Sequence, residues 1–297
     1  MKLTMDSIRS RHSTRTFDGA PLERGEERDL RAAFAEAVPG PFGSSPRFLL
    51  ATRDEIEEGV SSDAPAAASA KGRVRIGTYG LIVGPRAFVA GVVRRAPFAC
   101  VDFGYCLEGI ILRATELGLD TCWIGGVFGR GAIARALEAR EEEFVPATTP
   151  VGRAARRHSI QEVLTMAGSR QGSRKQFAEL FFEAGSDGSW LPLDGPGEWK
   201  EILEAVRIGP SARNMQPWRI VLDRRSRESL HLVMQEDRFY NNVLGDVKLQ
   251  ELDMGIAMRH VEVAASEFGF KGAWTRLEVC PVAIKEPRRY IASFVRG

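Results

Sequence analysis

The residues best suited to chemistry lie in three short segments, and the first of these is rich in cations. Arg11–Phe17 (RHSTRTF) places two arginines, a histidine and two hydroxyl residues within five positions. Guanidinium groups donate charge-assisted hydrogen bonds in a planar fork, which suits the oxygens of a phosphate. A short basic run is also typical of a solvated turn. This basic arm therefore predicts either a phosphate site or an exposed turn.

The second segment, Gly209–Trp218 (GPSARNMQPW), comes just before an apolar run typical of a buried strand. Its Ser, Asn and Gln side chains offer directed hydroxyl and amide groups beside an aromatic residue. That combination suits a planar heterocycle, which has edges and faces to recognise. Ser, Asn and Pro also favour turns, so an ordinary helix-to-strand turn explains this amide arm equally well.

The third segment is a glycine turn, Trp123–Gly126 (WIGG), which follows an expected strand at 119–124. Glycine permits close approach of backbone N–H groups to a ligand, although glycines after a strand are common in ordinary turns. Three arginines follow a further expected strand at 145–151 and could reach a phosphate or remain solvated: Arg153, Arg156 and Arg157.

A helix-stop-strand unit occurs twice and must position these segments. Residues 101–126 carry apolar side chains at helical spacing, then Gly118 and a short apolar run, and residues 252–274 repeat this pattern. Three identical pairs share an offset of 151 residues: Asp102 and Asp253, Gly118 and Gly269, and Trp123 and Trp274. These matches indicate an internal duplication.

The flanking segments extend the repeat. Pro46–Thr52 resembles Pro217–Asp223 at an offset of 171, so the first copy carries an insertion, which we place in part at Ser61–Lys71. Further expected pairs are the helices 22–37 and 199–208 and the strands 87–93 and 230–234, and strand 145–151 is matched with 290–295. We therefore divide the chain into a first half (1–158), a connection (159–173) and a second half (174–297).

Alternating helices and strands in each half predict an α+β fold in which helices pack on a central sheet. A duplicated unit of this kind is typical of a fused dimer, with two halves related by a pseudo-twofold axis. Clefts favour such boundaries, so we expect the ligand site between the halves.

Taken together, RHSTRTF, PSARNMQPW and ELGLDTCWIGG resemble the flavin-dependent nitroreductase family, and in particular its tandem-duplicated, single-chain branch. The resemblance covers most of the chain. It implies a nitroreductase-like fold in which two duplicated α/β halves form an intrachain pseudo-dimer, with central sheets flanked by helices.

The resemblance also assigns cofactor-binding residues. It implies that Arg11, Ser13 and Arg15 hold the phosphate of FMN, with His12 beside them, and that Arg156 or Arg157 completes this phosphate site. In the family, the amide arm of the other subunit lines the flavin, which corresponds here to Ser211, Asn214 and Gln216. The backbone amides of Gly125 and Gly126 would lie near the flavin N5 atom.

The two halves keep complementary parts of this machinery. The first half has the basic arm, but its PGPFGSSPRF lacks the Asn and Gln of the amide arm, whereas the second half keeps only SRKQF of the basic arm. Fusion allows one of two equivalent sites to decay. The sequence therefore predicts one composite FMN site per chain.

The expected activity is that of an FMN-dependent oxidoreductase, in which NADPH or NADH reduces the flavin and a nitroaromatic or quinone-like acceptor then reoxidises it in ping-pong turnover. No catalytic side chain is required, because the flavin carries the chemistry. The alternatives are a flavin-binding or ligand-sensing protein with little turnover, a repurposed FMN enzyme, and a fold without cofactor.

Composition narrows the remaining classes. The chain has 297 residues, 44% of them hydrophobic, and a net charge of +2, which argues against binding driven by nucleic-acid phosphates. Four cysteines without a CxxC pair and four histidines give no spacing for a metal site. Without an apolar run long enough for a signal or a membrane span, we expect a cytoplasmic protein with no membrane partner. We also expect a monomer, with further dimerisation left open.

Overall fold

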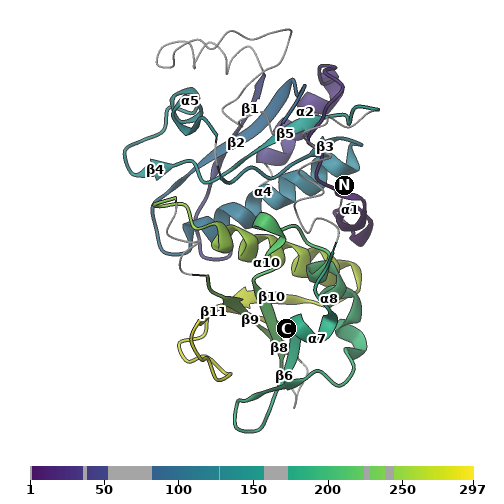
Figure 1. Cartoon of the computed structure of the whole chain (residues 1–297), viewed down its shortest axis with the longest axis vertical. Helices are drawn as coiled ribbons and strands as arrows, with labels where there is room; N and C mark the ends of the chain where they lie inside the picture. Colours follow the sequence, from purple (N-terminus) through teal and green to yellow (C-terminus); the bar gives the residue numbers. More distant parts are fainter. Residues whose placement is uncertain are drawn as a thin grey trace.

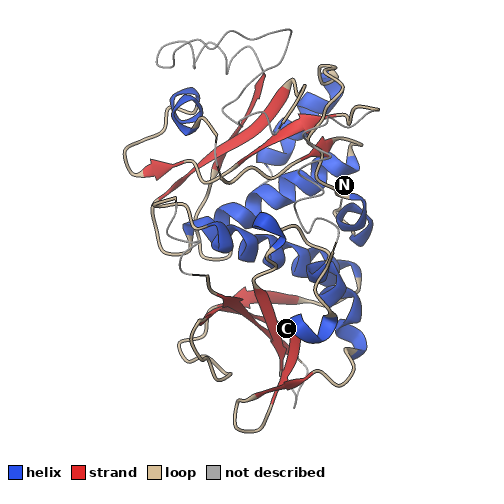
Figure 2. Ribbon diagram, in the orientation of Figure 1, coloured by secondary structure: helices blue, strands red, loops and turns tan. Residues whose placement is uncertain are grey.

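Two sheets enclose a central layer of helices (Figure 2). This computed structural model describes residues 2–35, 39–52, 82–126, 128–156, 173–223, 228–237 and 244–297. The expected insertion at Ser61–Lys71 and all of the connection except Ser173 lie outside these ranges. Within them, the α+β class is confirmed.

The first sheet is built from the first half of the chain. Its strand order is β1-β2-β5-β3, and β4 pairs separately with β2. The strands are β1 (Arg47–Thr52), β2 (Ala87–Arg94), β3 (Asp120–Thr121), β4 (Glu143–Phe144) and β5 (Thr148–Gly152), and the accompanying helices are α2 (Arg24–Ala35) and α5 (Arg130–Ala136).

The second sheet is built from the second half, with the order β10-β11-β9-β8-β6-β7. Its strands are β6 (Phe181–Ala184), β7 (Trp190–Pro192), β8 (Trp218–Leu222), β9 (Ser229–Gln235), β10 (Gly272–Thr275) and β11 (Arg288–Arg296). Its smaller helices are α7 (Phe177–Leu180), η1 (Gly197–Trp199), α8 (Lys200–Arg207) and η2 (Ala212–Asn214).

The two sheets share one topology. In chain order, β1, β2, β3 and β5 correspond to β8, β9, β10 and β11, and in each sheet the first two strands lie side by side while the last two exchange places. All of these shared pairings are antiparallel. The correspondence supports the duplication inferred from the repeated sequence pattern.

Two long helices, α4 (Ala99–Glu116) and α10 (Leu249–Glu267), pack side by side between the sheets (Figure 1). A Cβ atom on Gly104 would lie 2.3 Å from the backbone oxygen of Leu252, and one on Gly255 would lie 2.0 Å from that of Val101. Each residue of one contact is 151 positions from its equivalent in the other. Such reciprocal contacts are the property of an isologous interface, here formed within one chain.

Several elements differ in length from the sequence expectation. The helix expected from Leu22 begins at Arg24, where the Glu26 carboxylate accepts a hydrogen bond from the Glu23 backbone N–H. The strand expected at 119–124 is reduced to β3 and an isolated bridge at Ile124. The sheet ladder is interrupted because the Cys122 N–H donates to the Thr149 hydroxyl instead of to a strand carbonyl.

The first helix, α1 (Met5–Ser10), packs against the other half. Met5 and Ile8 are buried in the same cluster as Trp199 of η1 and the central part of α8. The Arg9 guanidinium reaches Glu201 of α8 at 2.9 Å. The chain therefore begins on the second half before it returns to the first. No helix in the described part of the chain is long and apolar enough to cross a membrane.

Candidate functional site

α1 ends where the basic arm begins, and the basic arm then runs from the second half to the first. The backbone of Arg11 turns to an extended conformation (φ −62°, ψ 124°) at the C-terminus of α1. Ser13 then forms a bridge with Thr121 of β3, and Phe17 forms one with Ala154 just after β5. Arg11 therefore lies where the chain passes from the core of the second half to the sheet of the first.

Arg11 is a buried cation with an unsatisfied donor. The residue is 9% exposed, and its Nη1 atom has no hydrogen-bond partner in the described part of the chain. Burial lowers the pKa of Arg11 below its usual value, and the negative charge of Glu108 counteracts this shift. A buried donor without an acceptor is energetically unfavourable, so an anion binding here would relieve the cost.

Glu108 is the centre of a buried hydrogen-bond network that joins the two long helices. Its Oε1 lies 2.8 Å from His260 Nε2, and its Oε2 accepts from the Trp123 indole at 2.7 Å. His260 Nδ1 lies 2.8 Å from the carbonyl oxygen of Ala205. Because a carbonyl only accepts, Nδ1 carries hydrogen, and Nε2 faces the Glu108 carboxylate. The network fixes the first residue of the glycine turn.

Arg130 of α5 fixes the other end of the glycine turn. Its guanidinium donates to the backbone oxygens of Gly125 at 2.6 Å, Gly126 at 2.8 Å and Val145 at 3.2 Å. A Cβ on Gly125 would lie 2.6 Å from the side chain of Leu249, so the turn packs against the first turn of α10. Arg130 thereby occupies the turn carbonyls and brings the turn to the boundary between the halves.

The amide arm has an unusual backbone. Three residues that are not glycine have positive φ angles: Arg213 at 50°, Asn214 at 55° and Gln216 at 48°. Conformations of this kind are disfavoured and cluster at functional sites. Asp253 of α10 accepts from the Ala212 N–H at 2.9 Å, and the Ser211 hydroxyl accepts from the Gln216 N–H at 2.8 Å. These bonds hold the strained loop against α10.

The amide side chains of this arm bind the second half itself. Asn214 Oδ1 accepts from Arg174 at 2.6 Å, and Asn214 Nδ2 donates to the Ser173 carbonyl at 2.8 Å. Gln216 is 2% exposed, and its Oε1 accepts from the Lys175 N–H at 2.8 Å. In this structure, both predicted ring-binding amides therefore hold the second-half remnant of the basic arm, Ser173–Phe177.

The other predicted residues lie nearer the surface. His12 is exposed and lies 3.0 Å from Asp120 through Nε2. Ser13 and Arg15 are partly buried, and the Ala155 N–H donates to Thr16, which brings the exposed Arg156 towards the basic arm. Arg157 lies outside the described residues. The glycine turn and the amide arm thus both lie against α10, Arg11 lies where the chain passes between the halves, and His12 is exposed.

The position equivalent to the glycine turn in the second half is filled. Arg276 stands 151 residues after Gly125, and its Nη1 donates to the backbone oxygens of Tyr290 at 2.9 Å and Ile291 at 2.6 Å. Its guanidinium carbon lies 4.8 Å from the ring centroid of Phe98. Phe98 in turn stacks on Phe42, with a centroid separation of 4.4 Å. We call this group the closed region.

The buried network also has no copy in the closed region. Arg259 and Gly109 stand where the repeat would place the equivalents of Glu108 and His260. The Arg259 guanidinium lies over the Tyr105 ring, 3.9 Å from its centroid, and would meet any Cβ on Gly109. The two regions therefore differ in charge as well as in packing.

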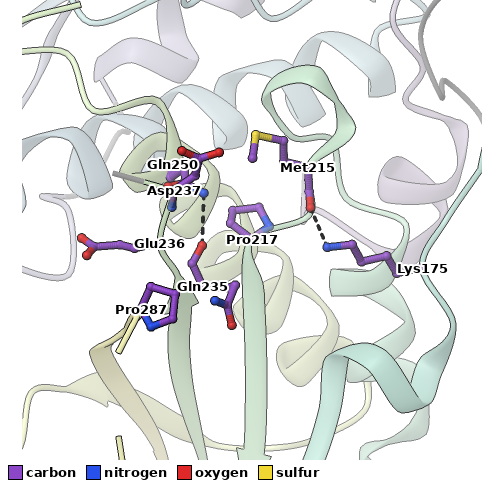
Figure 3. Close-up of a pocket in the computed structure, with 8 residues that line it drawn as sticks. All are labelled: Lys175, Met215, Pro217, Gln235, Glu236, Asp237, Gln250 and Pro287. Carbon is purple, nitrogen blue, oxygen red and sulfur yellow. Dashed lines mark hydrogen bonds between the residues drawn. The ribbon is translucent and has the colours of Figure 1, made fainter. Parts of the chain in front are cut away.

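A pocket of about 480 Å³ opens beside the amide arm (Figure 3). Its lining comes entirely from the second half: Lys175, Met215, Pro217, Gln235, Glu236, Asp237, Gln250 and Pro287. The Lys175 ammonium donates to the Met215 carbonyl at 2.9 Å, and Gln250 accepts from the Asp237 N–H at 2.8 Å. Arg11 instead lines a smaller cavity of about 210 Å³. The two pockets share no lining residue.

Sequence reasoning did not identify four residues of the site: Glu108, His260, Arg130 and Arg174. Glu108 and His260 sit on apolar helices without a recognisable motif. The one available signal was a charged residue within each predicted buried helix. Arg130 carried no signal, because its partners are backbone oxygens. Arg174 lies within the SRKQF remnant of the basic arm, but its partner Asn214 is 40 positions away.

The chain is similar in sequence and in structure to known proteins. The family model described as "Putative TM nitroreductase" matches residues 76–265. A comparison with curated proteins found no match. A solved structure titled "putative nitroreductase" from Thermotoga maritima MSB8 is 16% identical, with a TM-score of 0.57, over 100% of this chain and 93% of that chain. That likeness agrees with the nitroreductase-like fold expected from the sequence.

Two further solved structures match about half of this chain, each with a TM-score of 0.39. A nitroreductase family protein from Clostridium novyi NT is 20% identical over 52% of this chain and 87% of that chain. An FMN-dependent nitroreductase from Clostridium difficile R20291 is 17% identical over 52% of this chain and 88% of that chain. Because the family model spans more than half of the sequence, the chain belongs to this nitroreductase family, a family of oxidoreductases.

Proposed function

We propose that the protein is an FMN-dependent oxidoreductase of nitroreductase type, with one composite cofactor site per chain. The observation that carries the proposal is the buried Nη1 of Arg11 at the boundary of the halves, which has no partner among the residues that the structure describes. Such an atom favours an anionic ligand over a neutral one. The strained amide arm and the glycine turn adjoin the same boundary and suit a planar ring system.

The chain's own residues fit the two ends of FMN. Arg11, Ser13, Arg15 and Arg156 would hold the phosphate, and the arginines supply its counter-charge. Gly125 and Gly126 would present backbone N–H groups to the flavin ring, because Arg130 occupies their carbonyls. Ser211 would contact the ring edge, while Asn214 and Gln216 support the loop from within. His12 faces outward and has at most an indirect role.

FMN, when bound, supplies hydride-transfer chemistry, so the chain contributes binding, orientation and charge. Oriented N–H donors near the flavin N1, O2 and N5 positions would stabilise negative charge on the ring, as an oxyanion hole does. The Glu108–His260 network holds Trp123, and through it the turn that carries these donors. No side chain needs to act as a nucleophile.

The expected reductant is NADPH or NADH, and the expected acceptor is a small nitroaromatic or quinone-like molecule that binds after the nicotinamide leaves. Because each chain contains both halves of the pseudo-dimer, a monomer is sufficient for the site. We expect no nucleic-acid or membrane partner.

The test is to purify the protein, identify any released chromophore, and follow NADPH or NADH oxidation with and without an added quinone. The proposal expects FMN and acceptor-dependent oxidation with ping-pong kinetics. FMN without turnover would instead support a flavin-binding or ligand-sensing protein. Failure to bind FMN after reconstitution would overturn the proposal.

A further inference from the structure

We propose that Arg174, from the second half of the chain, is a second cation of the anion site and binds the same phosphate as Arg11. This inference deepens the proposed function and rests on it. It adds a residue from the second-half remnant of the basic arm, so that cations from both halves close on one anion.

Arg11 is buried and Arg174 is partly buried, and the two like charges lie within electrostatic range of each other. Arg174 bonds the Ile208 carbonyl directly after α8, the helix against which α1 packs just before Arg11. Burial lowers the pKa of Arg174, and repulsion from Arg11 and from Arg207 lowers it further. Arg207 is neutralised by Glu204, which accepts two hydrogen bonds of 2.6 Å. Glu108 offsets the charge of Arg11, but no carboxylate offsets that of Arg174 among the described residues. Net positive charge therefore remains at the boundary, and a bound anion would neutralise it.

Two hydrogen bonds fix the guanidinium of Arg174, and most of its N–H donors are not used by them. Its Nη1 donates to Asn214 Oδ1 at 2.6 Å, and its Nη2 donates to the Ile208 carbonyl at 2.8 Å. A guanidinium has five N–H groups in a rigid fork, so these two bonds fix its plane without using all of its donors. Arg174 is thus oriented before any ligand arrives.

The amide arm acquires a specific role in this arrangement. Asn214 holds both the Ser173 carbonyl and the Arg174 guanidinium, and Gln216 holds the Lys175 N–H. The amide arm thereby presents the second-half remnant to the boundary. The left-handed backbone of Asn214 and Gln216 is part of this presentation. These two amides position a cation there.

The first half has no equivalent cation. Alignment of SRKQF with STRTF places Thr14 at the position of Arg174. The Thr14 hydroxyl lies 3.4 Å from Asp120 on the first sheet. The second cation is therefore a property of one side of the pseudo-dimer only.

The ligand class follows from charge and geometry. A phosphate monoester carries a charge of about −1.5 to −2 near neutral pH and three acceptor oxygens. Two forked guanidinium groups match both the charge and the acceptors, and a neutral ring system matches neither. The inference therefore concerns the phosphate end of the cofactor.

The test compares FMN with riboflavin, which has the same ring but no phosphate. Dissociation constants are measured for wild type, Arg174→Gln and the control Arg207→Gln, whose charge is already paired. Loss of a charge-assisted contact predicts about 10- to 100-fold weaker FMN binding in Arg174→Gln, with riboflavin unchanged. Arg207→Gln should bind both ligands as wild type does.

Three other outcomes would overturn either the inference or the proposed function. Equal weakening of FMN and riboflavin in Arg174→Gln would assign Arg174 a purely structural role and overturn the inference. Unchanged FMN binding would also overturn it. Failure of wild type to bind either flavin would instead refute the proposed function.

A second variant covers the case in which Arg174→Gln does not fold. Arg174→Lys keeps the charge but loses the fork, and should give FMN binding between wild type and the expected loss. Thermal unfolding of the flavin-free protein in inorganic phosphate, against chloride at equal ionic strength, gives an independent readout. Phosphate should raise the wild-type melting temperature more than that of Arg174→Lys, and equal shifts would contradict the inference.

Discussion

The boundary between the halves contains two equivalent regions with opposite properties. The region around Gly125 contains the glycine turn, the buried carboxylate of Glu108 and the cation Arg11, whose Nη1 has no partner in the described part of the chain. In the closed region, Arg276 occupies the position of the glycine, and Phe98 and Phe42 pack against it. A symmetric dimer would have to keep both regions alike. A fused chain can keep one for a ligand and use the other for packing.

Asp102 of α4 and Asp253 of α10 are equivalent in the repeat, and they differ in hydrogen bonding. Both Asp102 oxygens accept backbone N–H groups, from Phe42 and from Ser44 at 2.8 Å. In Asp253 only Oδ1 has a partner, and Oδ2 is buried without one in the described part of the chain. Asp102 is thus satisfied at both oxygens, while Asp253 keeps one buried oxygen without a partner among the described residues.

The largest expected effect comes from breaking the buried network. Glu108→Leu leaves His260 Nε2 and the Trp123 indole without a partner, so we expect a loss of about 3–5 kcal/mol in the free energy of unfolding. Glu108→Gln keeps the shape of the side chain and two polar groups facing His260 and Trp123, and should lose much less stability. Arg259→Leu in the closed region is the matched control. Denaturant titration would contradict this account if both leucine variants lost the same stability.

The second-largest expected effect comes from removing the charge of Arg11. Arg11→Met should weaken FMN binding about 100-fold, because a charge-assisted contact is lost. The melting temperature should hold or rise, since an unsatisfied buried cation is removed. Arg276→Met should leave FMN binding unchanged. Flavin fluorescence titration and thermal unfolding measure the two effects, and full FMN occupancy in Arg11→Met would refute the assignment.

The two aspartates should respond differently to pH. Burial raises the pKa of Asp253 to about 8, whereas the unfolded chain has a value of about 3.9. The folded protein therefore holds a proton that the unfolded chain has lost, and this contribution to stability falls by about 1.4 kcal/mol per unit as pH rises from about 4 to about 8.

Asp253→Asn removes that dependence and should raise the melting temperature above wild type at about pH 8. Asp102→Asn should destabilise at every pH, because an amide nitrogen would face a backbone N–H. Melting temperatures measured across this pH range test both variants. Parallel curves for wild type and Asp253→Asn would count against a protonated Asp253.

The smallest expected effect concerns the glycine turn. Arg130→Gln releases the Gly125 and Gly126 carbonyls, so the turn should lose its fixed orientation. We expect about tenfold weaker flavin binding and a shifted flavin absorption band, while Arg130→Lys restores part of both. Glu138→Gln, at an exposed residue shortly after α5 that takes no part in these bonds, is the control. A spectrum identical to wild type would remove Arg130 from the site.

The architecture of two similar halves could be predicted from the sequence, because matching residues of the repeated pattern stand 151 positions apart. The pairs around Gly118 and Gly269, with φ of 73° and 79°, and the crossing of α4 with α10 follow from one repeated pattern. That Arg11, the glycine turn and the amide arm form one composite site stays a prediction.

The sequence could not predict which groups form hydrogen bonds with the polar side chains. Glu108 and His260 are 152 positions apart, and only the packing of α4 on α10 makes them neighbours. Asn214 and Gln216 match a ligand-binding pattern, yet their amides bind Ser173–Lys175 of the same half. Hydrogen-bond choice among nearby polar groups depends on backbone placement to within an ångström, which spacing alone does not specify.

The central claim is that only the region around Gly125 binds the cofactor. The most direct test is the ratio of FMN to protein at saturation, measured by absorbance after reconstitution and gel filtration. This account predicts one FMN per chain. A ratio of two would show that the closed region also binds FMN and would contradict it.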